Sequence, residues 1–289
     1  MSNSLETGGS ERQFSALARS LDRASFRVHL GCINHEGPFL EGLGDVPAFP
    51  VGGSMYGPQS LKARLQLVRH VKRNNISIAH AFDFYTNLLL IPAARWAGVP
   101  VVIGSQRQLG DLLTWKQERA QAMALRWCDT VVCNSRAAAA RLVELGLHRD
   151  RLTIIGNGLP EAAFAAVAPA LPREPGVLRV GMIARMNSRS KNHDLFLRMA
   201  ARLQSRFPAL QFVIVGDGPL RSELERNAEE LGLGGHVYFL GDRQDAPAVL
   251  ASIDVSLVPS RSESLSNVVL ESMAAGVPVV AFRVGGNSE

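Results

Sequence analysis

The sequence predicts an α/β protein built from two doubly wound domains in tandem. Short apolar runs rich in Val and Ile alternate with helical patterns along the chain, which is typical of parallel sheets covered by helices. The runs are apolar throughout rather than alternating, so the strands are expected to be buried on both faces. The stretch at 161–176 holds three prolines and little periodicity, and it predicts a linker between two such series.

Each series supplies five strand candidates separated by helical stretches. In the first half of the chain they lie at residues 27–33, 76–80, 100–104, 130–134 and 152–156. In the second half they lie at residues 178–184, 211–216, 236–241, 254–259 and 278–282. The predicted domains therefore span residues 1–165 and 176–289, and ligands are expected beyond the carboxyl ends of the strands.

Composition narrows the class of protein. With 46% hydrophobic residues the 289-residue chain can bury sizeable cores. Its most apolar stretch, residues 88–103, is broken by prolines and an arginine and is too short to span a membrane. The first residues lack the pattern of a secretory signal, which predicts a cytoplasmic protein. The three cysteines form no CxxC pair and are expected to be reduced core thiols: Cys32, Cys128 and Cys133.

The whole net charge of +5 lies in the first 175 residues, which hold 19 Lys and Arg against 14 Asp and Glu, whereas the rest holds 12 of each sign. The densest basic segment, residues 59–75, predicts a helix that carries five cations and no acid: Lys62, Arg64, Arg69, Lys72 and Arg73. This helix either packs on a sheet with a solvated outer face or rests on an anionic membrane surface. Nucleic acid is not expected as a partner, because no aromatic residues interleave with the cations.

Glycines and cations at the ends of predicted elements suit a phosphorylated ligand. Gly8 and Gly9 open a helix, where backbone N–H groups and the helix dipole attract phosphate, although such a pair also serves as a plain turn. Arg185 closes a strand and Lys191 precedes the next helix. A guanidinium and an ammonium that converge in this way suit a diphosphate.

Residues 216–219, GDGP, match half of a dinucleotide fingerprint. Gly216 and Gly218 occupy its first two glycine positions, but Arg221 stands at the third. A nicotinamide cofactor is therefore not expected.

The stretch SESLSNVVLESMAAG, residues 262–276, places one glutamate before a helix and a second inside it. Glu263 follows a predicted strand, beside a helix start at Leu265 and Ser266, and Glu271 lies in the second helical turn. Carboxylates accept hydrogen bonds from vicinal diols, which sugars and ribose both offer. Two structural alternatives stay open: Glu263 caps the helix, and Glu271 pairs with a nearby arginine.

These motifs, in this order, resemble the retaining glycosyltransferases of family 4. The family signature, with two glutamates eight positions apart, appears as PSRSESLSNVVLESMAAGVPVVAFRVGG at residues 259–286. The resemblance extends to NGLP at 157–160, to GDGP at 216–219 and to LETGGSERQ at 5–13. It implies the GT-B fold, in which two Rossmann-like domains face a cleft.

The resemblance also implies roles for the site residues. Glu263 would hold the transferred sugar, Glu271 the ribose, and Arg185 with Lys191 the diphosphate. The other donor contacts would come from Gly8, Gly9, Leu265, Ser266 and Gly216.

Three positions depart from the family pattern. Ser264 stands where the family usually has glycine, and Lys191 follows Arg185 one residue later than is commonest. Residues 80–83, HAFD, keep one histidine of a family pair but have Phe82 in place of the second. Asp83 then either replaces its contact with the donor sugar or caps the following helix.

The resemblance implies transfer of a sugar from a nucleotide-sugar donor with retention of configuration and without a metal or cofactor. The acceptor would be a glycan or a lipid-linked sugar of the cell envelope, met at the inner face of the membrane. Relatives continue beyond both ends of this sequence, so an opening strand is expected to be absent and the C-terminal domain to be incomplete. Two alternatives remain: a non-catalytic nucleotide-sugar-binding remnant and a GT-B epimerase.

Overall fold

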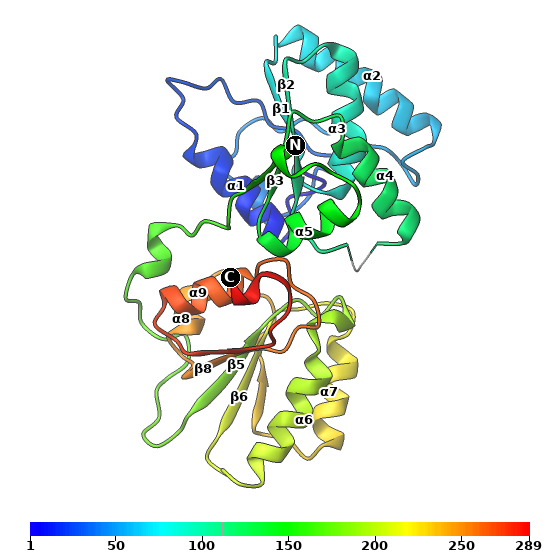
Figure 1. Ribbon diagram of the computed structural model, residues 1–289. Helices are drawn as coiled ribbons and strands as arrows, with labels where there is room; N and C mark the ends of the chain where they lie inside the picture. Colours follow the sequence, from blue (N-terminus) through cyan, green and yellow to red (C-terminus); the bar gives the residue numbers. More distant parts are fainter. Residues whose placement is uncertain (111–112) are drawn as a thin grey trace. The chain divides into compact units, whose positions relative to one another are not determined.

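The computed structural model describes residues 1–110 and 113–289. The chain divides into two compact units, Met1–Gly158 together with Glu289, and Leu159–Ser288. Each unit is built on a parallel sheet with helices packed against it (Figure 1). The predicted α/β class and the parallel sheets are thereby confirmed.

The first unit holds a four-stranded parallel sheet in the order β1-β2-β3-β4. Its strands are β1 (Ile78–His80), β2 (Val101–Gln106), β3 (Thr130–Cys133) and β4 (Leu152–Ile154). Its α-helices are α1 (Gly9–Ser20), α2 (Pro58–Arg73), α3 (Phe84–Ala97), α4 (Trp115–Leu125) and α5 (Arg136–Glu144). Side chains from the sheet and from α2 to α5 form one continuous apolar core, which stabilises the unit by removing apolar surface from water.

Side-chain caps fix where three of these helices begin. The Asp83 carboxylate accepts a hydrogen bond from the Thr86 N–H at 3.0 Å and starts α3, and Thr114 caps α4 in the same manner through Gln117. Ser135 caps α5. Such residues satisfy N–H groups that the first turn of a helix leaves without a partner.

The strand predicted at residues 27–33 was wrong. Only Cys32 forms β-bridges there, one to Ser2 and one to Ala48. The residues before it, 25–30, instead line a cavity of about 590 Å³ together with residues 74–78. A strand requires a neighbouring backbone at hydrogen-bonding distance. Most of this apolar run has no such neighbour, so no ladder forms along it.

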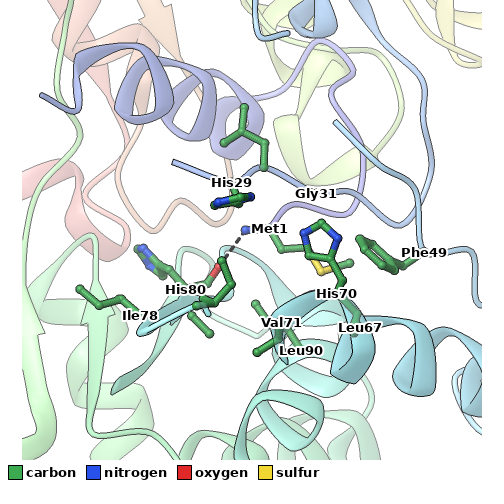
Figure 2. Close-up of a pocket in the computed structure, with 13 residues that line it drawn as sticks. Met1, His29, Gly31, Phe49, Leu67, His70, Val71, Ile78, His80 and Leu90 are labelled. Atoms are coloured by element: carbon green, nitrogen blue, oxygen red, sulfur yellow. Dashed lines mark hydrogen bonds between the residues drawn. The ribbon is translucent and has the colours of Figure 1, made fainter. Parts of the chain in front are cut away.

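The first residues of the chain lie between Cys32 and the end of β1. The amino group of Met1 donates to the His80 carbonyl at 2.8 Å, beside a second cavity of about 70 Å³ whose wall includes His29, His70 and Phe49 (Figure 2). Burial lowers the pKa of this amino group to about 5. Met1 also accepts a hydrogen bond from the Phe82 N–H at 3.1 Å, so Met1 lies beside the end of β1.

The second unit holds a five-stranded parallel sheet in the order β7-β6-β5-β8-β9. Its strands are β5 (Arg179–Ile183), β6 (Gln211–Val215), β7 (Val237–Phe239), β8 (Val255–Val258) and β9 (Val279–Ala281). Its α-helices are α6 (His193–Gln204), α7 (Arg221–Glu230), α8 (Ala246–Leu250) and α9 (Asn267–Ala274). From β5 the chain first adds strands on one side and then returns to add β8 and β9 on the other.

The proline-rich segment predicted as a linker lies against the second unit. The Ala170 N–H donates to the Ala248 carbonyl at 2.9 Å, and Arg173 forms an ion pair with Asp254 at 2.7 Å. The structure divides the chain before this segment, after Gly158.

The three cysteines are buried and unpaired, as predicted. Burial raises the pKa of the Cys32 thiol to about 11 and that of Cys128 and Cys133 to about 12. At neutral pH they are therefore unreactive thiols.

In the described part of the chain, no helix is both long enough and apolar enough to cross a membrane.

Candidate active site

The loops that follow β5 and β8 lie next to each other at the switch point of the second sheet. β5 pairs with β6 on one side and with β8 on the other, so the direction of strand addition reverses between β5 and β8. The Arg261 N–H donates to the Ser190 carbonyl at 2.8 Å, which joins the two loops directly. Ligands of doubly wound sheets bind in the crevice at such a point.

Lys191 and Glu263 meet at this switch point. Lys191 ends a short 3-10 helix, Arg189–Lys191, and its Nζ lies 2.6 Å from Oε1 of Glu263 in the loop after β8. The Lys191 side chain is 32% exposed and the Glu263 side chain 12%. The structure therefore brings together a cation suited to phosphate and a carboxylate suited to sugar hydroxyls, and each neutralises the other.

Arg185 lies in the same loop but has a different environment. Two backbone hydrogen bonds fix its neighbours, from Ala184 N–H to the Val215 carbonyl and from Met186 N–H to the Asp217 carbonyl, both 2.8 Å. The guanidinium itself is exposed, and within residues 1–110 and 113–289 no hydrogen bond or ion pair involves it. Arg185 is therefore positioned by its backbone and can bind an anion without losing a protein contact.

Arg189 lies between these two cations in sequence but points elsewhere. Its guanidinium pairs with Glu223 at 2.8 Å and with Asp194 at 3.4 Å, and both acids belong to helices of the same unit. Arg189 consequently serves as a natural comparison for Arg185 and Lys191.

Gly216 and Gly218 are required by close packing of two loops. Both have positive φ angles, and a Cβ at Gly216 would lie 2.2 Å from the Ala184 carbonyl oxygen. At Gly218 it would lie 2.6 Å from the Met186 carbonyl. The GDGP motif thus holds the Arg185 loop against the end of β6, and Arg221, at the third fingerprint position, pairs with Asp217 at 2.7 Å.

We expect Gly216→Ala to destabilise the protein by more than about 1 kcal/mol, because an L side chain disfavours this φ and the Ala184 carbonyl leaves no room for it. Urea unfolding measures the loss. Gly234→Ala is the matched control, since a Cβ there meets nothing within 4 Å. Equal stability of the two variants would contradict this account of the motif.

Glu271 lies in α9 and is 7% exposed. The helix is attached to the sheet by a hydrogen bond from the Ser272 hydroxyl to the Ser256 hydroxyl at 2.9 Å. The preceding loop is held by the Gly286 N–H, which donates to the Ser264 carbonyl at 2.9 Å. Leu265 is half-buried and Ser266, the N-cap of α9, is buried, so the helix start has a defined position after β8.

The predicted site residues of the first unit lie at helix starts. Gly8 is the N-cap of α1 with an extended backbone, and Gly9 is the first helical residue. Asp83 caps α3 and also accepts a hydrogen bond from the Asn3 N–H at 2.6 Å. Its carboxylate is thus committed to the fold, which is the structural alternative stated for this residue.

The His80 side chain is likewise engaged in a contact within the first unit. Its Nε2 lies 2.8 Å from the Ser105 hydroxyl, and burial lowers its pKa to about 3. The ring is therefore neutral at physiological pH and cannot serve as a cation there.

Two residues that sequence reasoning missed support the Lys191 loop. Asn192 is buried with a left-handed backbone (φ 65°), and its Nδ2 donates to the Pro259 carbonyl at 3.0 Å. His193 starts α6, and its Nε2 lies 3.3 Å from the carbonyl of Ala184, next to Arg185. For Asn192 the only signal in the sequence was an asparagine directly after a cation and before a helix. Nothing in the sequence pattern indicated a role for His193.

Arg107, after β2, was also missed. Its Nη2 donates to Oδ1 of Asn157 at 2.6 Å, its guanidinium lies 4.7 Å from the centre of the Phe82 ring, and burial lowers its pKa to about 10. The only signal in the sequence was a charged residue directly after an apolar strand.

No group of three or more metal-ligating side chains occurs among the residues that the structure describes.

Comparison with known proteins identifies related sequences and structures. Two family models match the chain, Glycosyltransferase Family 4 over residues 7–162 and Glycosyl transferases group 1 over residues 177–289. The first covers more than half of the chain.

Two curated relatives illustrate the range of substrates. The chain is 25% identical to the UDP-Gal:alpha-D-GlcNAc-diphosphoundecaprenol alpha-1,3-galactosyltransferase of Escherichia coli, over 93% of this chain and 74% of the relative. It is 31% identical to the GDP-mannose-dependent alpha-(1-6)-phosphatidylinositol monomannoside mannosyltransferase of Mycolicibacterium smegmatis, over 70% of this chain and 57% of the relative.

A solved structure shares the fold. Anabaena Alr3699/HepE, crystallised with UDP and glucose, superimposes with a TM-score of 0.83 over 99% of this chain and 81% of its own, at 21% identity. This likeness confirms the GT-B fold. With two matching family models and this fold, the chain belongs to glycosyltransferase family 4, the glycosyl transferases of group 1.

Proposed function

We propose that this protein transfers a sugar from a nucleotide-sugar donor to an acceptor with retention of anomeric configuration. The observation that carries the proposal is the contact between Lys191 and Glu263 at the switch point of the second sheet, with Arg185 nearby in the same loop. The family membership supplies the reaction class, and the paired charges supply groups for the two halves of a donor.

The chemistry follows from these groups. When the donor binds, its diphosphate competes with Glu263 for Lys191, and Glu263 becomes able to accept hydrogen bonds from the sugar hydroxyls. As the bond between the anomeric carbon and the diphosphate oxygen breaks, negative charge grows on the diphosphate, where Lys191 and Arg185 stabilise it. The leaving diphosphate takes the proton of the acceptor hydroxyl, and the new bond forms on the same face of the sugar. No metal ion or cofactor takes part.

A UDP-hexose is the first donor to test. The Anabaena structure was solved with UDP and glucose, and the E. coli relative is named for UDP-Gal, whereas the M. smegmatis relative uses GDP-mannose. A thermal-shift screen of UDP-, GDP- and ADP-sugars should show one nucleotide class that raises the melting temperature. Turnover of the labelled donor then tests catalysis, and NMR of the product tests retention. Donor binding without turnover of any acceptor would favour the alternative, a non-catalytic nucleotide-sugar-binding protein.

We also propose that the acceptor is a glycan or a lipid-linked sugar met at the inner, cytoplasmic face of a membrane. Helix α2 would be attracted to the anionic surface of that membrane.

Not all five cations of α2 are available to bind such a surface. Arg64 donates to the Met55 and Leu88 carbonyls at 3.2 and 3.3 Å, so it holds α2 on α3. The remaining four cations are exposed: Lys62, Arg69, Lys72 and Arg73.

Replacing these four cations by glutamine is expected to release the protein from anionic vesicles at low salt. Each contributes roughly 1 kcal/mol near an anionic surface, and salt screens the effect within about 8 Å. Co-sedimentation measures the bound fraction. Equal binding to neutral vesicles, or an unchanged bound fraction for the glutamine variant, would mean that the outer face of α2 is only solvated and does not bind the membrane.

A further inference from the structure

The outer face of α4 carries an unusual set of exposed side chains. Residues at four-residue spacing lie on one face of a helix, and here that row holds Trp115, Arg119 and Met123. Trp127 follows in the turn after α4, which ends at Leu125. Trp115 is 63% exposed, Met123 66% and Trp127 56%. The opposite face packs into the core through Ala122 and Leu125.

Cations fill the spaces between these apolar groups. We use the name α4 stripe for six residues: Trp115, Lys116, Arg119, Met123, Arg126 and Trp127. Lys116 Nζ lies 5.6 Å from the centre of the Trp115 ring, and the Arg119 guanidinium lies 6.0 Å from it. Arg126 is anchored by hydrogen bonds to the Leu145 and Gly146 carbonyls.

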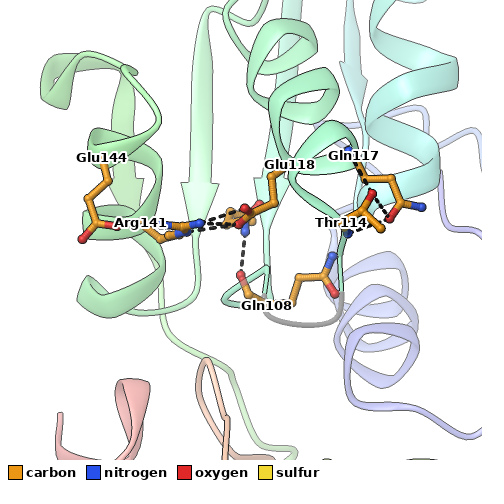
Figure 3. A network of polar contacts seen from close by, with 7 residues as sticks. Gln108, Thr114, Gln117, Glu118, Arg141 and Glu144 are labelled. Atoms are coloured by element: carbon orange, nitrogen blue, oxygen red, sulfur yellow. Dashed lines mark hydrogen bonds and ion pairs between the residues drawn. The ribbon is translucent and has the colours of Figure 1, made fainter.

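The helix has one carboxylate, and it is turned away from the α4 stripe. Glu118 is 12% exposed and forms an ion pair at 2.8 Å with Arg141 of α5, which also pairs with Glu144 (Figure 3). The α4 stripe is therefore purely cationic and apolar. Its charge complements an anionic partner.

The composition and setting of the α4 stripe favour a lipid surface as that partner. Tryptophan prefers the boundary between lipid headgroups and acyl chains, and helices that bind there combine it with Lys and Arg. Because α2 packs on α3 and α3 on α4, the exposed cations of α2 belong to the same helical layer (Figure 1). Exposed cations thus lie on two helices of this layer, α2 and α4, whereas Arg95 of α3 is paired with Asp129. Two separate cationic helices suit an extended anionic surface better than a compact protein partner.

We infer that the outer face of α4 docks on an anionic lipid surface. Trp115, Met123 and Trp127 enter the headgroup region, while Lys116 and Arg119 bind lipid phosphates. The inference rests on the proposed membrane-side function and names the surface that inserts. Its test uses neither donor nor acceptor, so its failure would leave the proposal of glycosyl transfer standing.

The first measurement compares two double variants that remove equal charge. Lys116→Gln with Arg119→Gln is expected to weaken binding to vesicles of equal parts phosphatidylglycerol and phosphatidylcholine by about tenfold or more. The control, Arg198→Gln with Arg202→Gln, removes two exposed arginines from α6 and should leave binding nearly unchanged. Equal losses in both variants would mean that only net charge matters and would overturn the inference, as would equal binding to pure phosphatidylcholine or equally tight binding to heparin.

The second measurement reads insertion directly. The chain has three tryptophans, so W96F/W127F retains only Trp115 and W96F/W115F retains only Trp127. Vesicles with brominated acyl chains should quench both reporters. The control, W96F/W115F/W127F/F207W, places the only indole at Phe207, which is 54% exposed in the second unit, and it should not be quenched. Equal quenching of the control, or no quenching of the two reporters, would refute insertion by α4.

Discussion

Replacing Arg185 or Lys191 by alanine is expected to lower the single-turnover transfer rate at saturating donor by about 10²- to 10³-fold. Removing a group that stabilises charge developing in a transition state has an effect of about this size. The effect should appear in the rate more than in donor affinity, because the charge on the diphosphate grows as the bond to the sugar breaks. Rapid-quench measurement of labelled donor gives the rate, and titration of the donor gives the affinity.

Arg189→Ala is the matched control for this pair. Arg189 lies between Arg185 and Lys191 in sequence, but its guanidinium is engaged by Glu223 and Asp194. Its loss should leave the transfer rate nearly unchanged. If Arg185→Ala and Lys191→Ala lose only donor affinity and keep the transfer rate, the two cations bind the donor without stabilising the transition state. The proposed role in the transition state would then be wrong.

Glu271→Ala is expected to weaken binding of the nucleotide by about 1.5–3 kcal/mol, since the ribose would lose hydrogen bonds to a charged acceptor. This corresponds to a loss in affinity of about 10- to 150-fold. A bare nucleoside diphosphate should lose as much as the complete donor, because the predicted contact lies on the ribose. Isothermal titration measures both, and the melting temperature of the variant shows whether removal of this buried side chain has disturbed α9.

The corresponding 2′-deoxy nucleotide supplies the decisive comparison. It lacks one of the ribose hydroxyls that Glu271 is proposed to hold, so Glu271→Ala should weaken its binding far less than that of the ribonucleotide. Glu229→Ala, which removes an exposed carboxylate of α7, should affect neither. Equal affinity of Glu271→Ala and the parent protein for the bare nucleotide would refute the ribose assignment.

The sequence predicted strands well wherever a paired neighbour was available, including the edge strands β7 and β9. The run at residues 178–184 became β5, which pairs with β6 and with β8. The run at residues 27–33 formed only bridges at Cys32, because most of its length has no paired backbone beside it. An apolar pattern records a preference for burial, and whether a ladder forms depends on what lies beside it.

The fold class, the family and the candidate groups could be predicted from the sequence, because apolar periodicity and motif spacing are local properties. Which of the charged groups are already paired depends on how the chain packs. The tertiary structure paired Lys191 with Glu263, engaged Arg189 with two helices and left Arg185 exposed, although all three are cations of one short segment. It likewise committed Arg64 of α2 to backbone carbonyls and exposed the α4 stripe. The sequence identifies each charged residue but not its partner. For Lys191 that partner is Glu263, 72 residues away, and packing of the two loops brings them together.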